Sequence, residues 1–127
     1  MTQENKELLL KDLCARLPHG VKCKILETNE VKILGSVQYD GENTLFDFWE
    51  DDQKIQYGHQ LYLSEFKPYL FPLSSMTDEQ KEDMIKSSCG IGSDKNVFDW
   101  YNKNHFDYRG LIEKSLALDA TNLRIYE

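Results

Sequence analysis

The chain lacks most of the features that identify a functional class directly. Its 127 residues include three cysteines, Cys14, Cys23 and Cys89, which are widely spaced and form no CxxC pair. An odd number without such a pair argues against a disulfide framework or a zinc site, and we expect no metal and no cofactor. The longest apolar runs are only three to four residues, so no membrane-spanning segment and no membrane partner are expected.

Positive charge is also scarce. Fifteen Lys and Arg oppose 22 Asp and Glu, so the formal net charge is -7. Nucleic acids and anionic membranes repel a negative protein, and we do not expect a nucleic-acid partner. The first residues are polar and lack the basic-then-apolar pattern of a signal peptide, which predicts a location in the cytoplasm.

Length and composition favour a single domain spanning residues 1–127. The chain is 40% hydrophobic and 12% aromatic, and its length is close to the commonest domain size. A chain of this size buries about two-thirds of its unfolded surface, so it needs neither a disulfide nor a metal to fold.

Residues 5–17 are predicted to form a helix, because apolar residues recur there at spacings of three and four. This stripe consists of Leu9, Leu10, Leu13, Cys14 and Leu17. Pro18 and Gly20 are expected to end the helix.

Residues 21–64 change to a period of two, which predicts an antiparallel meander of three to four strands. The strands are expected near 21–25, 31–39, 44–49 and 60–64, with turns at Asn29 and at the Asp40–Gly41 dipeptide. Pro68 and Pro72 argue against a central strand in the next segment, so residues 65–76 are predicted to be an extended connector.

Residues 77–118 are predicted to be mainly helical. Thr77 and Gln80 have the spacing of a capping box, which predicts a helix over 77–88. A second helix is expected to start at Ser93 or Asp94, and a third to be capped by Asp107 and to turn Leu111, Ile112 and Leu116 inward. A last edge strand is expected over 122–126. The predicted fold class is therefore α+β, with an N-terminal helix, a meander and two to three short C-terminal helices.

Two groups of residues suggest catalysis weakly. Asp47, Glu50, Asp51 and Asp52, with His59 nearby, have oxygen ligands for a divalent metal but lack the spacing of a known calcium loop. Their alternative interpretation is a solvated strand-to-loop junction.

His105 is the best candidate base, because Asp107 could orient its imidazole as a carboxylate does in a triad. The alternative is a packed, hydrogen-bonded histidine at a junction between helices. No serine or cysteine enzyme motif is present, so no catalytic residue is assigned.

Two further patterns suggest phosphate binding. Lys22, Lys24 and Lys32 are expected to share the outward face of the first hairpin, where they could bind phosphate groups. The alternative interpretation is that this face of the sheet is simply exposed to solvent. Gly90 and Gly92 suggest a phosphate loop but lack the third glycine and the lysine of that motif, and a hinge between helices explains them.

The densest feature is the aromatic segment of residues 98–109. Aromatic side chains, a histidine and an arginine in such a short stretch are typical of binding surfaces. They can also line a pocket for a planar ligand, with the arginine holding a phosphate or carboxylate. The alternative is a corner between two helices whose aromatic side chains fill the core. The candidate binding residues are Trp100, Tyr101, His105, Tyr108 and Arg109.

Two stretches carry a family resemblance: residues 67–77, KPYLFPLSSMT, and residues 98–114, FDWYNKNHFDYRGLIEK. Together they resemble a family of short uncharacterised proteins of bacteriophages and prophages of Bacteroides-type bacteria. The resemblance covers roughly the C-terminal half. It implies a phage accessory protein in the cytoplasm of a bacterial host, and it implies no activity.

These observations favour a non-enzymatic accessory protein that binds a protein partner, and they leave self-association open. The alternative is a protein that binds or sequesters a small ligand such as a nucleotide, for example one used in host defence signalling. A third hypothesis is a small hydrolase that uses His105 or a metal at the acidic cluster.

Overall fold

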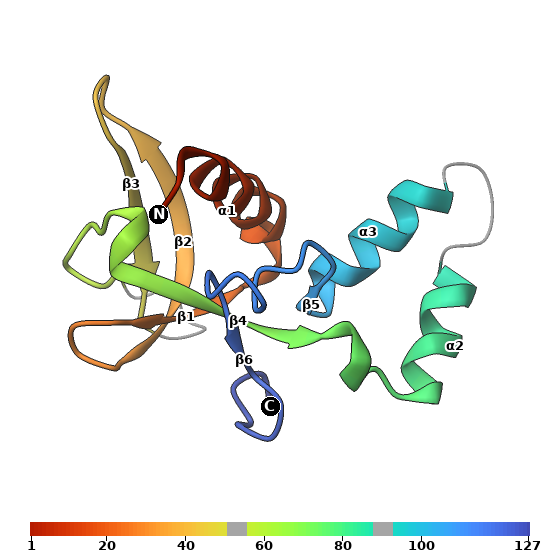
Figure 1. Ribbon diagram of the computed structural model, residues 1–127. Coiled ribbons are helices and arrows are strands. Elements are labelled where there is room, and N and C mark those ends of the chain that lie inside the picture. The colour runs from red at the N-terminus through yellow and green to blue at the C-terminus, as the bar shows by residue number, and fades with distance from the viewer. Residues whose placement is uncertain (51–55, 88–92) are drawn as a thin grey trace.

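The computed structural model describes residues 1–50, 56–87 and 93–127, and it confirms the α+β class. An N-terminal helix lies on one face of a largely antiparallel sheet, and two further helices lie beyond the far end of the long strand β4 (Figure 1).

The first helix, α1 (Gln3–Arg16), begins where Thr2 Oγ1 accepts a hydrogen bond from Asn5 N at 3.1 Å. A 3-10 turn, η1 (Leu17–His19), follows and ends at Gly20, whose φ of 68° suits glycine. The buried positions of α1 are Leu9, Asp12, Leu13 and Arg16. The expected apolar stripe is wrong at Cys14, which is exposed, because two charged residues take the inward positions.

The predicted hairpins are present. They consist of β1 (Lys22–Ile25), β2 (Val31–Tyr39) and β3 (Thr44–Trp49), paired in antiparallel order. Asp40 Oδ1 accepts from the backbone of Glu42 and Asn43 at 2.9 and 2.7 Å, which fixes the expected turn at Asp40. Asn29 has a φ of 61° in the other turn, a conformation that asparagine tolerates. The first half of the meander is therefore confirmed.

The predicted connector 65–76 is wrong, because most of it is a central strand, β4 (Phe66–Pro72). Over the described residues the order of strands is β3-β2-β1-β4-β5, where β5 is Phe106–Asp107, and β6 (Leu118–Asp119) is also paired to β4. Pro68 is tolerated because it lies opposite Cys23. The backbone groups of β1 that face β4 belong to the residues on either side of Cys23, so Pro68 is not required to donate a hydrogen bond to β1. Its missing N–H would point toward β6, whose pairing with β4 starts only at Tyr69.

The predicted strand at 60–64 is also wrong. Only Leu61 forms an isolated bridge, to Phe46, and the chain then makes the 3-10 turn η2 (Leu63–Glu65). Another such turn, η3 (Leu73–Ser75), follows β4.

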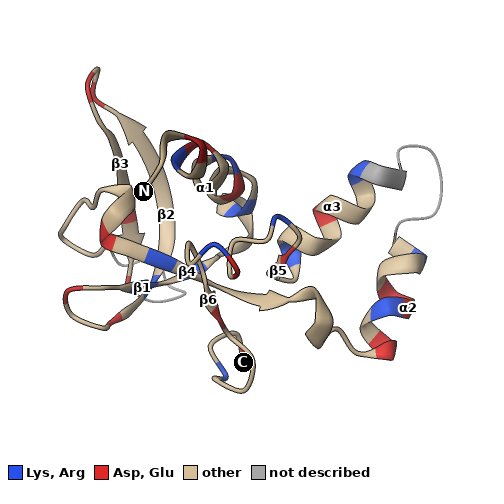
Figure 2. Cartoon of the chain, in the orientation of Figure 1, with Lys and Arg blue, Asp and Glu red and all other residues tan. Residues whose placement is uncertain are grey.

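The capping box at Thr77 and Gln80 is confirmed by reciprocal bonds of 3.1 and 2.8 Å. It starts α2 (Asp78–Ser87), whose first turn is acidic, as Figure 2 shows. The helix α3 (Ser93–Lys103) follows. The predicted hinge at Gly90 and Gly92 lies outside the described residues.

The third predicted helix and the edge strand at 122–126 are absent from the described chain. Residues 108–117 form successive turns between two short strands, β5 (Phe106–Asp107) and β6 (Leu118–Asp119), both parallel to β4. The last residues also form turns. The side chains expected inward still behave so, since Leu111 and Leu116 are buried and Ile112 packs against the core.

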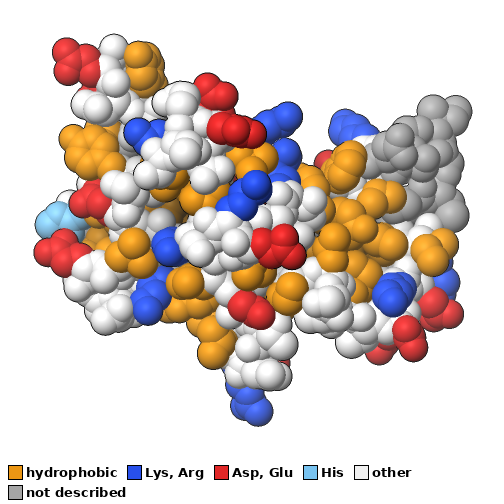
Figure 3. All heavy atoms as spheres, viewed as in Figure 1, with side chains coloured by type: hydrophobic (Ala, Val, Ile, Leu, Met, Phe, Trp, Pro, Cys, Tyr) orange, Lys and Arg blue, Asp and Glu red, His pale blue; other side chains and the backbone are white. Residues whose placement is uncertain are grey.

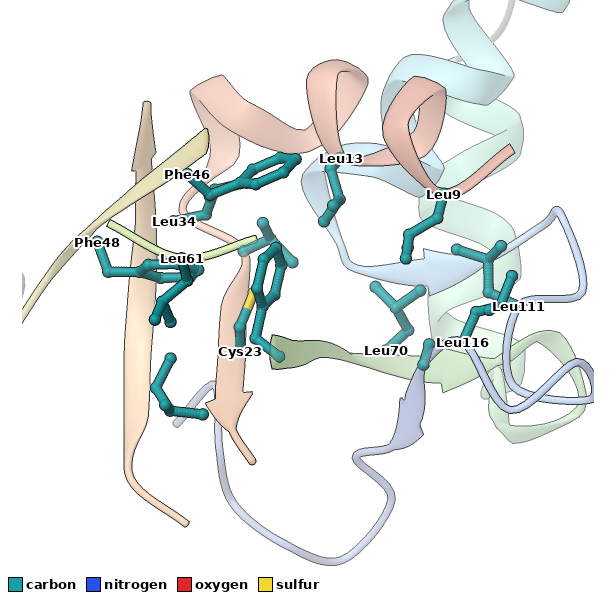
Figure 4. Close-up of a cluster of buried hydrophobic side chains, with 14 residues drawn as sticks. Leu9, Leu13, Cys23, Leu34, Phe46, Phe48, Leu61, Leu70, Leu111 and Leu116 are labelled. Carbon is teal, nitrogen blue, oxygen red and sulfur yellow. The ribbon is translucent and has the colours of Figure 1, made fainter. Parts of the chain in front are cut away.

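The core lies between α1, the sheet and the C-terminal turns. Leu9 and Leu13 point from α1 toward the strands, and Leu111 and Leu116 come close to Leu70 of β4 (Figure 4). Within the described ranges, no helix combines the length and the apolar character that crossing a bilayer requires.

Candidate binding site

Trp100, the first candidate residue, is buried and helps to hold the fold together. Its side chain is 6% exposed, and Nε1 donates to Asp83 Oδ2 at 2.8 Å. Its ring stacks on Phe106, with 5.5 Å between centroids and 12° between planes. Trp100 therefore joins α2, α3 and β5 and is the most buried aromatic residue of α3 that the structure describes.

Tyr101 and Tyr108 form a second group with Phe98. The two tyrosine rings stack at 5.5 Å, and Phe98 lies 5.1 Å from Tyr108. We call these three residues the aromatic ladder. Phe98 is 48% exposed. The ladder is thus half-buried at Tyr101 and exposed at Phe98.

Arg109 is held by a buried charge network that the sequence does not predict. Its Nε donates to Asp12 Oδ1 at 3.1 Å, and Arg16 Nε donates to Asp12 Oδ2 at 2.7 Å. Arg16 Nη2 also donates to the carbonyl of Phe106 at 2.6 Å. The side chains of Asp12 and Arg16 are 0% exposed. Arg109 is therefore engaged within the fold, and it does not offer a free cation to a phosphate.

One signal could have revealed this network. Asp12 and Arg16 have the i, i+4 spacing of a helical ion pair. They follow Leu9 and Leu13 by three positions each, which places all four residues on one helix face. Charged residues are rarely buried, so the apolar stripe alone does not point to this pair.

His105 lies apart from the other candidates. Its φ of 63° is left-handed, and its ring stacks on Tyr126 with a centroid distance of 3.7 Å and an angle of 10°. Nδ1 is buried without a hydrogen-bond partner among the described residues. Burial, together with the smaller effect of the positive charges of Arg16, His19 and Lys22, lowers the pKa of His105 to about 4. The ring is therefore neutral at neutral pH.

The predicted pairing of His105 with Asp107 is wrong. Both carboxylate oxygens of Asp107 accept backbone N–H groups, from Leu111 and Ile112, at 2.9 Å each. Asp107 thus caps a turn, as the sequence suggests, but its bonds leave no orienting role toward His105.

The acidic cluster does not form a metal site where the structure describes it. Asp47 accepts hydrogen bonds from Ser36 and Gln38 at 2.9 and 2.7 Å, and Glu50 lies 3.9 Å from Lys32. Asp51 and Asp52 lie outside the described residues, and His59 is exposed. No group of three or more His, Cys, Asp and Glu suited to a metal occurs in the described ranges.

The expected lysine stripe is wrong as well. Lys32 pairs with Cys23 in the register, whereas Lys22 pairs with Ile33 and Lys24 with Val31. Directly opposed residues share a face, so Lys32 lies on the other face from Lys22 and Lys24. Its Nζ binds Glu30 at 3.0 Å instead.

A pocket of about 680 Å³ lies beside His105, and we call it the C-terminal pocket. Its aromatic wall consists of Phe71, His105 and Tyr126. The Tyr126 hydroxyl accepts from Lys22 N at 2.9 Å and donates to Tyr69 O at 2.7 Å, so it bridges β1 and β4. This bond fixes the aromatic wall to the sheet.

The rest of the C-terminal pocket is polar. Three carboxamides, two cations and one carboxylate line it: Gln80, Asn104, Asn122, Lys103, Arg124 and Glu127. A smaller adjoining pocket of about 150 Å³ contains Thr121, whose Oγ1 is buried and has no partner in the described structure.

Left-handed backbone conformations concentrate at this pocket. Of the five described non-glycine residues with positive φ, His105, Asn122 and Arg124 line it, with values of 63°, 66° and 55°. Such conformations are uncommon for residues with a Cβ, although asparagine and histidine adopt them more often than most other residues do. Sequence reasoning found His105 alone, because no local pattern links it to residues near the C-terminus.

Comparison with known proteins adds no assignment, since no family model, no curated protein and no solved structure matches this chain.

Proposed function

We propose that this chain is a non-enzymatic binding protein that holds a small anionic ligand in the C-terminal pocket. The pocket volume of about 680 Å³ falls within the range of about 300–1,000 Å³ that small-molecule sites occupy. The same wall combines aromatic surface with convergent polar groups, which is the usual composition of such sites.

The observation that carries the proposal is the left-handed backbone at His105, Asn122 and Arg124 around one pocket. A strained backbone conformation costs on the order of 1–3 kcal/mol and persists where function or packing demands it. Arginine has no short polar side chain to ease the conformation as asparagine does. The unpartnered Nδ1 of His105 adds an unmet hydrogen-bonding capacity at the same place.

The charge around the pocket favours an anion. Lys103 and Arg124 line the wall and outnumber its one carboxylate side chain, Glu127, while the cations Arg16 and Lys22 lie close enough to His105 to oppose its protonation. Their positive potential contrasts with the net charge of -7 for the whole chain. A local cationic pocket in an acidic protein attracts small anions while the remaining surface repels nucleic acid.

One feature supports a role without catalysis. The neutral ring of His105 lacks the carboxylate partner that would orient a general base, since Asp107 is bonded to backbone. In the phage or prophage setting that the resemblance implies, such a protein would sequester a small ligand in the cytoplasm of the bacterial host.

The test is a titration of the protein with pyrophosphate and with citrate, followed by heteronuclear NMR and thermal unfolding. Shifts should concentrate at His105, Asn122 and Arg124. A ligand at about 100 times its dissociation constant should stabilise the fold by about 2.7 kcal/mol.

A matched pair of variants makes the test specific. Lys103→Gln removes a cation from the pocket wall, and Lys95→Gln removes an exposed cation from the same helix outside the pocket. Lys103→Gln should weaken anion binding and Lys95→Gln should not. Equal affinities for both variants, or no resonance shift with either anion, would contradict the proposal.

A second candidate function is the docking of a protein partner on the aromatic ladder. The observation that favours it is the exposure of Phe98, which extends a stacked pair of tyrosines to the surface. Figure 3 shows hydrophobic atoms gathered on one face over α2 and α3. Aromatic residues of this kind are common anchors of protein interfaces.

Phe98→Ser tests this second candidate against Tyr39→Ser, which removes an exposed aromatic ring from the end of β2. Binding of a host protein, or self-association measured by ultracentrifugation, should be lost with Phe98→Ser and retained with Tyr39→Ser. Loss with both variants, or with neither, would argue against the aromatic ladder as the docking surface.

A further inference from the structure

We infer that the anion held in the C-terminal pocket is a free mononucleotide, whose base stacks on the aromatic wall and whose phosphate meets the two cations. This inference rests on the proposed function, because it names the ligand class for the same pocket. It follows from three properties of the pocket. The aromatic surface is rigid, the carboxamides offer both donors and acceptors, and one cation, Arg124, can exchange its ion-pair partner for a ligand.

The aromatic wall is fixed before any ligand arrives. Tyr126 is held by Lys22 N and Tyr69 O through its hydroxyl, and His105 lies flat against it at 3.7 Å. Phe71 lies 5.8 Å from Tyr126 on the same wall. A planar ring gains most from such a preorganised aromatic surface, because stacking requires no further ordering of the protein.

The carboxamides offer both donors and acceptors. Gln80 uses its Oε1 to accept from Thr77 N at 2.8 Å, so it offers a ligand the Nε2 amino group. Asn104 uses Nδ2 to donate to Trp100 O at 3.0 Å, so it offers its Oδ1. Asn122 carries both kinds of group. A heterocyclic base presents donors and acceptors side by side along its edge, which matches this mixed set better than a simple carboxylic acid does.

The two cations that line the pocket suit a phosphate. Lys103 lies at the end of α3, and Arg124 forms an ion pair of 3.6 Å with Glu127. Both side chains of that pair are mainly exposed, so the pair contributes little to stability. Arg124 can therefore exchange Glu127 for a phosphate, to which its guanidinium binds in a bidentate manner.

The experiment compares the dissociation constants of AMP, GMP, CMP and UMP with those of adenosine, pyrophosphate and a single-stranded oligonucleotide by calorimetry. At least one mononucleotide should bind more than about tenfold tighter than adenosine or pyrophosphate, since only it uses both halves of the pocket.

The variant Asn122→Gly removes one carboxamide while keeping a residue that accepts the φ of 66°. It should weaken mononucleotide binding by about tenfold, the effect of one lost hydrogen bond, and leave pyrophosphate binding unchanged. The control is Asn29→Gly, which makes the same substitution at a φ of 61° in the β1–β2 turn and should leave both affinities unchanged.

The outcomes separate this inference from the proposed function. Pyrophosphate binding as tight as that of every mononucleotide would overturn the nucleotide assignment and leave the anion site standing. An absence of binding by any of these compounds would overturn both. Tighter binding of the oligonucleotide, or equal losses in Asn122→Gly and Asn29→Gly, would overturn the assignment of a free mononucleotide to this pocket.

Discussion

The substitution Asp12→Asn tests whether the buried charge network holds α1 against β5 and the turns that follow it. It removes the carboxylate that accepts from Arg16 at 2.7 Å and from Arg109 at 3.1 Å, while the side-chain volume stays nearly the same. Arg16 is 0% exposed, so its charge would lose its counter-ion without gaining water.

The magnitude follows from that burial. Breaking a buried ion pair by removing one partner costs about 3–5 kcal/mol, because an uncompensated charge remains inside the fold. In a domain of this size each kcal/mol lowers Tm by roughly 4 °C, so Tm should fall by about 12–20 °C. Arg109 is 18% exposed, and Arg109→Gln should therefore destabilise less.

The assay is urea denaturation followed by circular dichroism and tryptophan fluorescence, with Asp99→Asn as the control. Asp99 is an exposed carboxylate on α3, and its substitution should change the free energy of unfolding by less than about 0.5 kcal/mol. A double-mutant cycle of Asp12→Asn with Arg109→Gln should show a coupling energy above about 0.5 kcal/mol. If Asp12→Asn proved as mild as Asp99→Asn, the network would not stabilise the fold.

Three further substitutions or conditions test other parts of the structure. Gly35→Ala should destabilise the fold by about 1–3 kcal/mol in urea denaturation, because its Cβ would lie 2.8 Å from the ring of Trp49. Tyr126→Phe should lower the free energy of unfolding by about 1–3 kcal/mol, since it leaves two backbone groups of β1 and β4 without their partner. The lowered pKa of His105 predicts that stability is lost as pH falls from about 6.5 toward about 4, because the unfolded chain takes up the proton first; an NMR titration with a midpoint near 6.5 would contradict this.

Local sequence patterns were sufficient where the controlling interactions are local. The capping box at Thr77 and Gln80 and the turn at Asp40 depend on residues two or three positions apart, and both are confirmed. The hairpins likewise follow from period-two alternation next to turn residues.

The strand β4 could not be predicted in this way, because its tolerance of Pro68 depends on pairing with residues far away in sequence. The prolines indicate a break in any local interpretation. Only the register with Cys23, and the later start of β6, shows that the nitrogen of Pro68 has no bond to lose.

The candidate site was predicted only in part for a similar reason. The aromatic segment identified His105, but Asn122, Arg124 and Tyr126 come to it from a tail that was expected to be a strand. Left-handed conformations of residues other than glycine have no strong sequence signal, so the convergence of three of them could not be predicted.

The buried network and the C-terminal pocket are physically connected, which bears on how variants should be interpreted. Arg16 donates to the carbonyl of Phe106, and the neighbouring carbonyl of His105 accepts from Phe71 N at 2.8 Å. The position of His105 therefore depends on α1 through Arg16 and on β4 through Phe71. Asp12→Asn, which removes the counter-ion of Arg16, should thus weaken ligand binding and stability together. Asn122→Gly should weaken binding alone, because its carboxamide lines the pocket and its backbone conformation is kept.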